Sequence, residues 1–367
     1  MNYLYDLETV IKINSYTSNK AGVDKVGLVF DKWLEQLGFK VEIFERSSIG
    51  NHHYYKSNYS ENAKKLLLLG HLDTVFPPDK FENYREDNEW VYGAGVCDMK
   101  GGNIVFIQAL RELKRKKIDI QNIDILLVSD EETGSDDSKY LTEKLALEYD
   151  YCFVYEAAGK NMEVVTGRKG VGTFFINIIG QAAHAGNNYT QGVDANLEAS
   201  YKLQELIKLT DVELGTTLNV GKIEGGIGAN TISPYAKIIF ELRYKTQEEK
   251  NRVLQSIDNI VATSYVKGTI SSLSGGIQRD VMQTSVSSLE LIENIENIIG
   301  KELYSEERGG VSDANIVSSK GVVTLDGFGP FGDGDHTINE RANKKSFESR
   351  IELSRNLFKY FIENKKF

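Results

Sequence analysis

Short apolar runs alternate with helix-like segments through the first part of this 367-residue chain. Their spacing predicts, in chain order, a helix at 22–37, strands at 40–44 and 65–69, a helix at 103–113, a strand at 123–128, a helix at 138–147 and a strand at 151–155. This alternation is typical of a mixed, mostly parallel sheet that is flanked by helices on both faces. Because ligands of such α/β sheets bind beyond the carboxyl ends of the strands, we expect functional residues there.

From about residue 170 the pattern changes. We expect a strand at 171–179, a helix at 194–209, strands at 216–223 and 235–243, a helix at 247–262 and a strand at 266–273. This βαββαβ order is the ferredoxin-like signature. A helix at 288–299, a strand at 322–325 and a last helix from Ser346 follow. The sequence therefore predicts a main α/β domain built from 1–168 and 277–367, which an inserted domain at 169–276 interrupts.

Composition excludes several classes of protein. The formal net charge is −10, which argues against nucleic acid or an anionic membrane as a partner. No run approaches the roughly 18 apolar residues of a membrane span, and residues 1–8 do not resemble a secretory signal. The two cysteines, Cys97 and Cys152, are too few for a disulfide framework, and we expect both to be packed in the interior. We therefore expect a soluble, cytoplasmic protein.

One apolar run ends in a pair of residues suited to metal chemistry. Leu67, Leu68 and Leu69 lead through a glycine to His71, and Asp73 follows two residues later. Residues i and i+2 of an extended segment point to the same side. A metal-binding histidine usually donates its second ring N–H to a carboxylate, which fixes its tautomer. On its own, a histidine beside an aspartate at the end of a strand is more often a surface pair whose polar groups satisfy each other than a metal site.

Four further segments place acids or a histidine after a strand or in a glycine-rich loop. They are the glycine-rich segment 93–102 with Asp98, the segment 129–134 with Glu131 and Glu132, the segment 155–159 with Glu156, and the loop 332–340 with His336, which we expect to be buried. Two histidines and several carboxylates suit two zinc ions, and manganese or cobalt could substitute on ligand grounds. One carboxylate bridging both ions, with one histidine and one carboxylate on each, leaves Glu131 beside Glu132 as a general base.

These blocks resemble a known family in order and in spacing. The quoted segments are His71-Leu-Asp73-Thr-Val, Gly95-Val-Cys-Asp98-Met-Lys-Gly-Gly, Asp130-Glu131-Glu132-Thr-Gly134-Ser and the late His336. They resemble the di-zinc superfamily that contains glutamate carboxypeptidases, succinyl-diaminopimelate desuccinylases and aminoacylases, and are most similar to its glutamate carboxypeptidase branch. The resemblance implies a zinc exopeptidase-like catalytic domain (1–168 and 277–367) and an inserted lid and dimerisation domain.

The resemblance also implies a role for each residue of the main site. His71 and Glu156 would hold one zinc ion, Glu132 and His336 the other, and Asp98 would bridge the two. Glu131 would be the general base, and Asp73 the partner of His71. A cis peptide bond is implied between Asp98 and Met99.

In the inserted domain, the resemblance implies that His184 reaches a neighbouring subunit's site and polarises the scissile carbonyl. Asn230 and Arg243 match positions that bind the substrate carboxylate, a task that suits a guanidinium because it binds carboxylates bidentately. We therefore expect a homodimer formed through this domain.

The expected function is zinc-dependent hydrolysis of an amide bond. A metal-bound hydroxide, with Glu131 as base, would release a C-terminal amino acid from a small peptide or N-acyl amino acid with a free carboxylate. The alternatives are an N-acyl amino acid deacylase, a desuccinylase or a dipeptidase. A non-catalytic metal or peptide binder that keeps the fold is a third hypothesis, against which the complete ligand set and Glu131 argue.

Two more histidines, His52 and His53, match none of these blocks. We expect them in a loop and give them no metal role, because their spacing does not suit a ligand pair.

Overall fold

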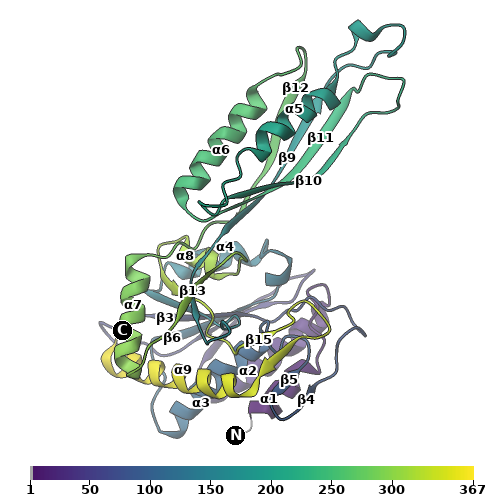
Figure 1. Cartoon of the computed structure of the whole chain (residues 1–367). Helices are drawn as coiled ribbons and strands as arrows, with labels where there is room; N and C mark the ends of the chain where they lie inside the picture. The colour runs from purple at the N-terminus through teal and green to yellow at the C-terminus, as the bar shows by residue number, and fades with distance from the viewer. Residues whose placement is uncertain (1–2) are drawn as a thin grey trace. The chain divides into compact units, whose positions relative to one another are not determined.

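The structure is a computed structural model that describes residues 3–367. The chain forms two compact units (Figure 1). The main unit comprises residues 3–167, 284–308 and 312–367, and the inserted unit comprises residues 168–283 and 309–311.

A six-stranded sheet forms the centre of the main unit, with the strand order β1-β2-β6-β3-β7-β14. β2 pairs antiparallel with β1 and β6, whereas β6, β3, β7 and β14 pair in parallel. This mixed α/β sheet confirms the predicted fold class. The strands are β1 (Lys40–Phe44), β2 (His52–Lys56), β3 (Leu66–His71), β6 (Ile123–Val128), β7 (Tyr151–Val154) and β14 (Val323–Leu325).

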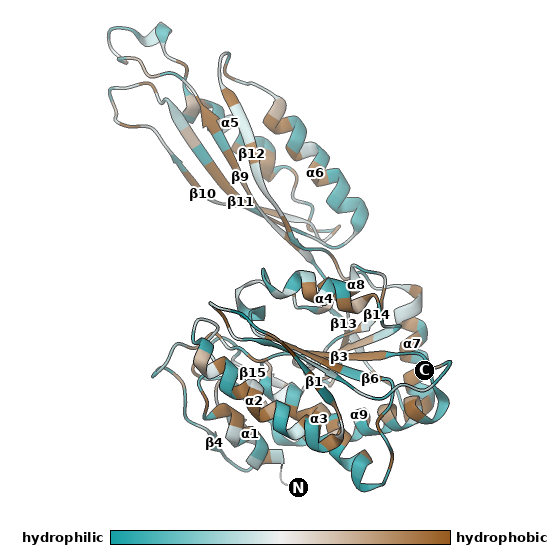
Figure 2. Cartoon of the chain, turned by 180° about the vertical axis from the view of Figure 1, so that it is seen from behind, coloured by the Kyte–Doolittle hydropathy of each residue, from teal (hydrophilic) through white to brown (hydrophobic). Residues whose placement is uncertain are grey.

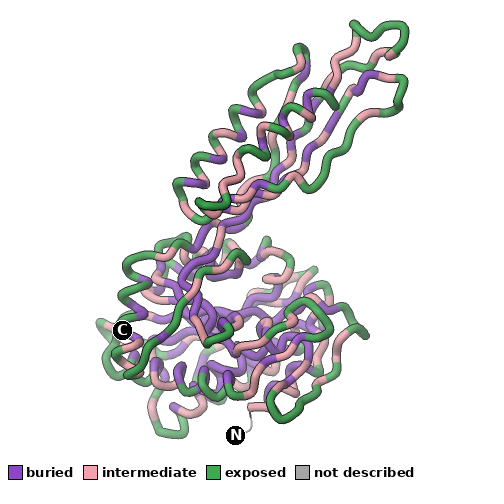
Figure 3. Tube along the Cα trace, in the orientation of Figure 1, coloured by how far each residue is buried: buried purple, intermediate pink, exposed green. Residues whose placement is uncertain are grey.

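Helices cover both faces of this sheet, which is why every residue of β3 and β6 is buried (Figure 3). α1, α2, α3 and α9 lie on one face, and α4 and α8 lie on the other (Figure 2). The helices of this unit are α1 (Tyr3–Ile11), α2 (Lys20–Leu37), α3 (Lys100–Arg115), α4 (Ser138–Ala146), α7 (Val286–Ile299), α8 (Ala314–Ser318) and α9 (Lys344–Asn364). α2 begins after Asn19, whose side chain accepts the N–H of Gly22, and ends at Gly38 in the left-handed conformation.

Two smaller sheets complete the main unit. One has the order β15-β16-β5-β4 and the other pairs β13 with β8. Because β16 pairs antiparallel with β5, the loop after β5 and the loop before β16 emerge side by side. These strands are β4 (Arg85–Glu86), β5 (Trp90–Tyr92), β8 (Val164–Arg168), β13 (Ser305–Arg308), β15 (Gly332–Asp333) and β16 (Arg341–Asn343).

The inserted unit has the predicted βαββαβ order. Its four strands pair antiparallel in the order β10-β11-β9-β12, and α5 and α6 pack against this sheet. The apolar side chains of both helices and the sheet form a separate core. The elements are β9 (Gly170–Ile179), α5 (Ala195–Ile207), β10 (Thr217–Gly225), β11 (Tyr235–Tyr244), α6 (Gln247–Ala262) and β12 (Ile270–Arg279).

Two expectations about local structure were wrong. The last strand of the inserted unit was expected at 266–273, but a turn occupies 266–269, in which Thr269 donates to the Val266 carbonyl, and β12 begins at Ile270. His52 and His53 lie in the buried strand β2 and not in a loop. His52 Nε2 lies 2.9 Å from Asp137, and His53 Nδ1 lies 2.8 Å from Asp31, so each ring has an aspartate partner from a distant segment.

Cys97 and Cys152 are both free and buried, as predicted. No helix within residues 3–367 has the length and apolar character needed to cross a membrane.

Candidate metal centre

Three neighbouring parallel strands deliver candidate residues at their carboxyl ends. His71 is the last residue of β3. β6 leads into a short 3-10 helix that begins at Glu131 and continues through Glu132. Glu156 follows the end of β7 by two residues. Since β3 lies between β6 and β7 in the sheet, the chain direction brings these residues to one edge.

Two loops add the remaining candidates. Asp98 lies between β5 and α3, and the peptide bond from Asp98 to Met99 is cis, as the resemblance implied. His336 lies in the loop before β16. The pairing of β16 with β5 therefore brings these two loops together.

The side chains form two groups that share Asp98. Asp98 Oδ1 lies 3.1 Å from His71 Nε2, and this nitrogen lies 3.7 Å from Glu156 Oε1. Asp98 Oδ2 lies 3.3 Å from His336 Nε2, which lies 3.2 Å from Glu132 Oε2. Each group thus contains one histidine and one glutamate, and the two oxygens of Asp98 face different histidines.

The ring of His71 is held by groups behind the site. Its Nδ1 lies 3.1 Å from the carbonyl oxygen of Asp73 and 3.3 Å from the Asp73 carboxylate. Thr17 Oγ1 donates to the other Asp73 oxygen at 2.6 Å, and Asn103 Nδ2 donates to the His71 carbonyl at 2.7 Å. A proton on Nδ1 leaves Nε2, which faces Asp98, with its lone pair for a cation.

The pKa values show a concentration of negative charge. Burial and the nearby Asp98 raise the pKa of Glu132 to about 7. Burial and Asp98 likewise raise the pKa of Glu156 well above its usual value. Hydrogen bonds to Asp98 and Glu132 raise the pKa of His336 to about 11. Burial alone would lower the pKa of His71, but the Asp73 and Asp98 carboxylates raise it well above its usual value.

This donor set fits divalent cations. Ligand atoms of His71, Asp98 and Glu132 all lie within 4.8 Å of one another. A bound cation stabilises the charged form of buried carboxylates whose pKa values are raised, and it takes the place of their protons. Mixed imidazole and carboxylate ligands are what zinc and similar transition metals bind. The residues present therefore suit a dinuclear metal site.

Glu131 lies beside this donor set but outside both groups. It is the first residue of the 3-10 helix, directly before Glu132, and is partly exposed. Its charge is close enough to contribute to the raised pKa of Glu156. A carboxylate in this position can exchange protons with a molecule held between the two groups.

The inserted unit holds the other three predicted residues in two places. The backbone of His184 forms an isolated antiparallel β-bridge with Thr231, and the Ala185 N–H donates to the Asn230 carbonyl. His184 and Asn230 therefore lie close together, before the start of β11. His184 Nδ1 accepts the N–H of Gly186 at 3.1 Å, which leaves the proton on the exposed Nε2. These exposed donors are not part of the metal groups, which belong to the main unit.

Arg243 lies at the opposite end of β11 from these two residues. Eight residue steps from Tyr235 to Arg243 correspond to roughly 26 Å of strand. The Arg243 guanidinium donates to Glu241 through Nε at 2.7 Å and to the Gly309 carbonyl through Nη1 at 3.0 Å. One chain therefore does not bring Arg243 together with His184 and Asn230.

His336 differs from expectation in its burial. The sequence suggested a buried histidine, but the side chain is 59% exposed, because its loop lies at the surface of the main unit. Thr17, Asn103 and Glu340, which contact residues of the site through hydrogen bonds, were not predicted. Glu340 lies in the His336 loop, where its proximity to a ligand was a usable signal, whereas nothing in the sequence marks Thr17 or Asn103.

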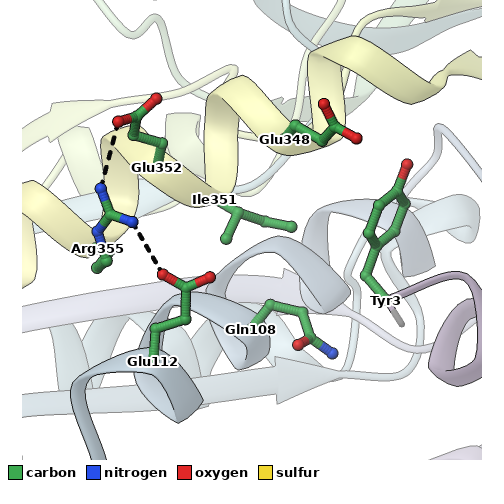
Figure 4. A pocket seen from close by; sticks show the side chains of 7 residues that line it. All are labelled: Tyr3, Gln108, Glu112, Glu348, Ile351, Glu352 and Arg355. Carbon is green, nitrogen blue, oxygen red and sulfur yellow. Dashed lines mark hydrogen bonds and ion pairs between the residues drawn. The ribbon is translucent and has the colours of Figure 1, made fainter. Parts of the chain in front are cut away.

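A cavity of about 580 Å³ between α1, α3 and α9 contains none of the candidate ligands (Figure 4). Arg355 donates to Glu112 at 3.0 Å and to Glu352 at 3.3 Å across its wall. Its charged lining groups therefore satisfy one another in part. The lining residues are Tyr3, Gln108, Glu112, Glu348, Ile351, Glu352 and Arg355.

Comparisons with known proteins agree with this geometry. The sequence profile of peptidase family M20/M25/M40 matches residues 67–360. Carboxypeptidase G2 from Pseudomonas sp. (strain RS-16) is 26% identical over 341 residues, which cover 90% of this chain and 82% of the relative. Acetylornithine deacetylase from Edwardsiella ictaluri is 29% identical over 228 residues, 58% of each chain. The crystal structure of a tripeptidase from Staphylococcus aureus superposes with a TM-score of 0.82 over 98% of both chains at 23% identity.

Proposed function

The chain belongs to peptidase family M20/M25/M40 and is a metallohydrolase of amide bonds; on that premise we propose that it releases the C-terminal amino acid from small peptides or N-acyl amino acids. The main support for the proposal is the position of Asp98, which has one carboxylate oxygen near His71 and the other near His336. Each of these histidines also lies near a glutamate of its own. This arrangement suits two cations joined by one carboxylate, and we propose two zinc ions per chain, for which cobalt or manganese could substitute.

Bound there, the two cations would supply Lewis-acid chemistry, which polarises a carbonyl and lowers the pKa of water. The oxygen of a water molecule attacks the amide carbon, and Glu131 accepts the proton that this water loses. When the C–N bond breaks, Glu131 returns this proton to the leaving nitrogen, so the products are a carboxylic acid and an amine. Asp73 keeps the His71 ring in place through Nδ1.

We infer the substrate class from three residues of the inserted unit. We assign Arg243 and Asn230 to the substrate carboxylate and His184 to the carbonyl oxygen, whose developing charge an N–H donor stabilises. The similarity to carboxypeptidase G2 over most of both chains supports release of a C-terminal residue. Arg243 would have to exchange part of its contact with Glu241 for the substrate.

The separation along β11 supports a homodimer. Arg243 and the pair His184–Asn230 lie at opposite ends of a strand, which is farther than a small substrate reaches. We therefore assign Arg243 to the site of its own chain and His184 and Asn230 to the site of the partner. We assign the dimerisation surface to α5 and β10 of the inserted unit, where Leu197, Tyr201 and Ile223 are exposed apolar side chains. This unit then serves both as lid and as dimerisation domain.

Replacement of the base tests the proposed reaction. Glu131→Gln keeps the size of the side chain but removes its basicity, so kcat on C-terminal glutamyl peptides should fall about 10²- to 10⁴-fold. Metal content should stay unchanged. Glu248→Gln, in the first turn of α6, is the matched control and should retain full activity. Retained activity in Glu131→Gln would refute the assignment.

A second candidate is an N-acyl amino acid deacylase, which the similarity to acetylornithine deacetylase favours. The same chemistry would serve a desuccinylase or a dipeptidase. A panel of C-terminal glutamyl peptides, other dipeptides, and acetylated and succinylated amino acids separates these by kcat/KM. A protein that binds metal but hydrolyses none of the panel would instead be a binder.

A further inference from the structure

Glu340 is a buried carboxylate that belongs to neither metal group. Its side chain is 1% exposed, and its oxygens accept three backbone N–H groups from the loop that carries Asp98. Oε2 accepts from Gly95 at 2.9 Å, and Oε1 accepts from Cys97 at 2.9 Å and from Asp98 itself at 3.1 Å. A single side chain therefore fixes the backbone directly in front of Asp98.

The Asp98 loop is shaped to receive this carboxylate. Gly95 has φ +83°, a conformation that glycine adopts without steric cost. A Cβ atom there would lie 3.0 Å from the Lys100 side chain. Successive N–H groups that point inward from such a bend form an anion-binding concavity, and here Glu340 fills it.

The other end of Glu340 is tied to the His336 loop. The Glu340 N–H donates to the Thr337 carbonyl at 3.1 Å, and Thr337 donates to the Gly334 carbonyl through both its N–H and its hydroxyl. The Glu340 carbonyl accepts the N–H of Gly93 at 3.4 Å. Backbone and side chain of Glu340 thus link the turn that presents His336 to the loop that presents Asp98.

We propose that Glu340 is a positioning residue that holds Asp98 and His336 as one unit for metal binding. It acts through the backbone N–H groups of the Asp98 loop. This inference rests on the proposed metal centre, because it concerns the placement of two of that centre's ligands. Groups that orient metal ligands in this way typically change metal affinity about 10- to 100-fold when they are removed.

A purely structural role makes a different prediction. If Glu340 only satisfied buried N–H groups, its loss would destabilise the fold without a selective effect on metal binding. If it positions the ligands, zinc affinity falls even in a folded variant. The kcat measured at limiting zinc then falls as well and recovers when free zinc is raised, while KM stays constant.

The test is a zinc competition titration of the full chain against a chromophoric chelator. Glu340→Gln keeps the length of the side chain but turns one acceptor into an NH₂ group that faces a backbone donor. We expect wild type to bind two zinc ions and Glu340→Gln to bind them about 10- to 100-fold more weakly. Thermal unfolding of the metal-free proteins, followed by circular dichroism, shows how far each variant is folded.

Two further variants keep the test decisive. Glu198→Gln, in the inserted unit, removes a buried carboxylate that accepts the Val266 N–H at 2.6 Å, and should lower stability without changing zinc affinity. Glu340→Asp retains the charge but shortens the side chain by one methylene, so its oxygens no longer reach the backbone N–H groups and zinc binding should weaken. This variant is measured instead of Glu340→Gln if Glu340→Gln does not fold.

The outcomes separate the two proposals. A wild-type protein that binds no zinc would overturn the proposed function and this inference together. Two zinc ions bound with equal affinity by wild type and both Glu340 variants would overturn the positioning role alone. An affinity loss in Glu198→Gln as large as that in the Glu340 variants would also overturn it, because the effect would then follow from stability.

Discussion

Asp98 is the residue at which the two halves of the site meet. Its oxygens lie 3.1 Å from His71 and 3.3 Å from His336, although these histidines are far apart in the sequence. One carboxylate with two ligand-facing oxygens is the simplest way to fix two cations near each other. Its position depends on the loop that Glu340 holds by three hydrogen bonds.

At this scale, Thr17 gives a test of how the His71 ring is supported. Thr17→Val removes the hydroxyl that donates to Asp73 at 2.6 Å and should lower stability by about 2 kcal/mol, since the partner is charged. It should also lower kcat, because Asp73 contacts the His71 ring. Thr216→Val removes an equivalent buried bond, to Glu249 at 2.6 Å in the inserted unit, and should cost similar stability without a change in kcat. Equal kcat values in the two variants would exclude a role for Thr17 in the site.

The sequence predicted the residues that face the site better than the residues behind them. His71, Glu132 and Glu156 lie at or just after the carboxyl ends of apolar strands. Because these strands run parallel, their carboxyl ends lie at the same edge of the sheet. Thr17 and Asn103 act through hydrogen bonds to partners from distant segments, and such bonds have no period or motif. The exposure of His336 depends on how its loop packs, which the glycines around it do not reveal.

Elements were predictable where apolar residues form a continuous run or recur with a clear period. The strand at 40–44, the strand at 123–128 and the helix at 247–262 have the expected bounds. β2 was missed because His52, His53, Tyr54 and Tyr55 are all buried by tertiary partners and show no alternation. The β12 region was misplaced because serines and glycines carry little strand signal.

A helix end provides a test at the element scale. Gly38 ends α2 with φ +99°, and a Cβ there would meet no atom within 4 Å. Gly38→Ala should therefore cost about 1 kcal/mol through the backbone conformation alone. Gly276→Ala, which also meets no atom but lacks a positive φ, should have almost no effect. Urea unfolding measures both, and a neutral Gly38→Ala would contradict this account of the helix end.

For the whole molecule, complementation tests the assignment of His184 to the partner's site. His184→Ala and Arg243→Ala should each be nearly inactive. Mixed dimers of the two variants regain one intact site, so random reassociation should restore about a quarter of wild-type activity. A mixture no more active than the separate variants would place His184 and Arg243 in the same chain's site, or exclude the dimer.

The metal-free molecule should lose stability as pH rises from about 4.5 to about 7. Glu132 has a usual pKa of 4.5, which the fold raises to about 7, so the folded state binds more protons than the unfolded state in this window. Glu340, with a pKa raised to about 8, acts in the same direction. Lys100, with a pKa lowered to about 7, acts oppositely, but only above this window. Urea unfolding in chelator at pH 5 and pH 7 measures the change.

The matched control is Glu132→Gln, which should lose less stability than wild type between these pH values. Metal-loaded wild type should show a smaller decline, because cations replace the protons of the ligating carboxylates. A metal-free protein that becomes more stable from pH 5 to pH 7 would show that the carboxylates are not crowded as described.

Anomalous diffraction from zinc-loaded crystals, measured on both sides of the zinc absorption edge, would locate the bound cations relative to Asp98. We expect two zinc peaks, one on either side of Asp98: one within about 2.0–2.3 Å of His71 and Glu156, and the other within that distance of His336 and Glu132. A single peak, or peaks that do not share the Asp98 carboxylate, would contradict this expectation.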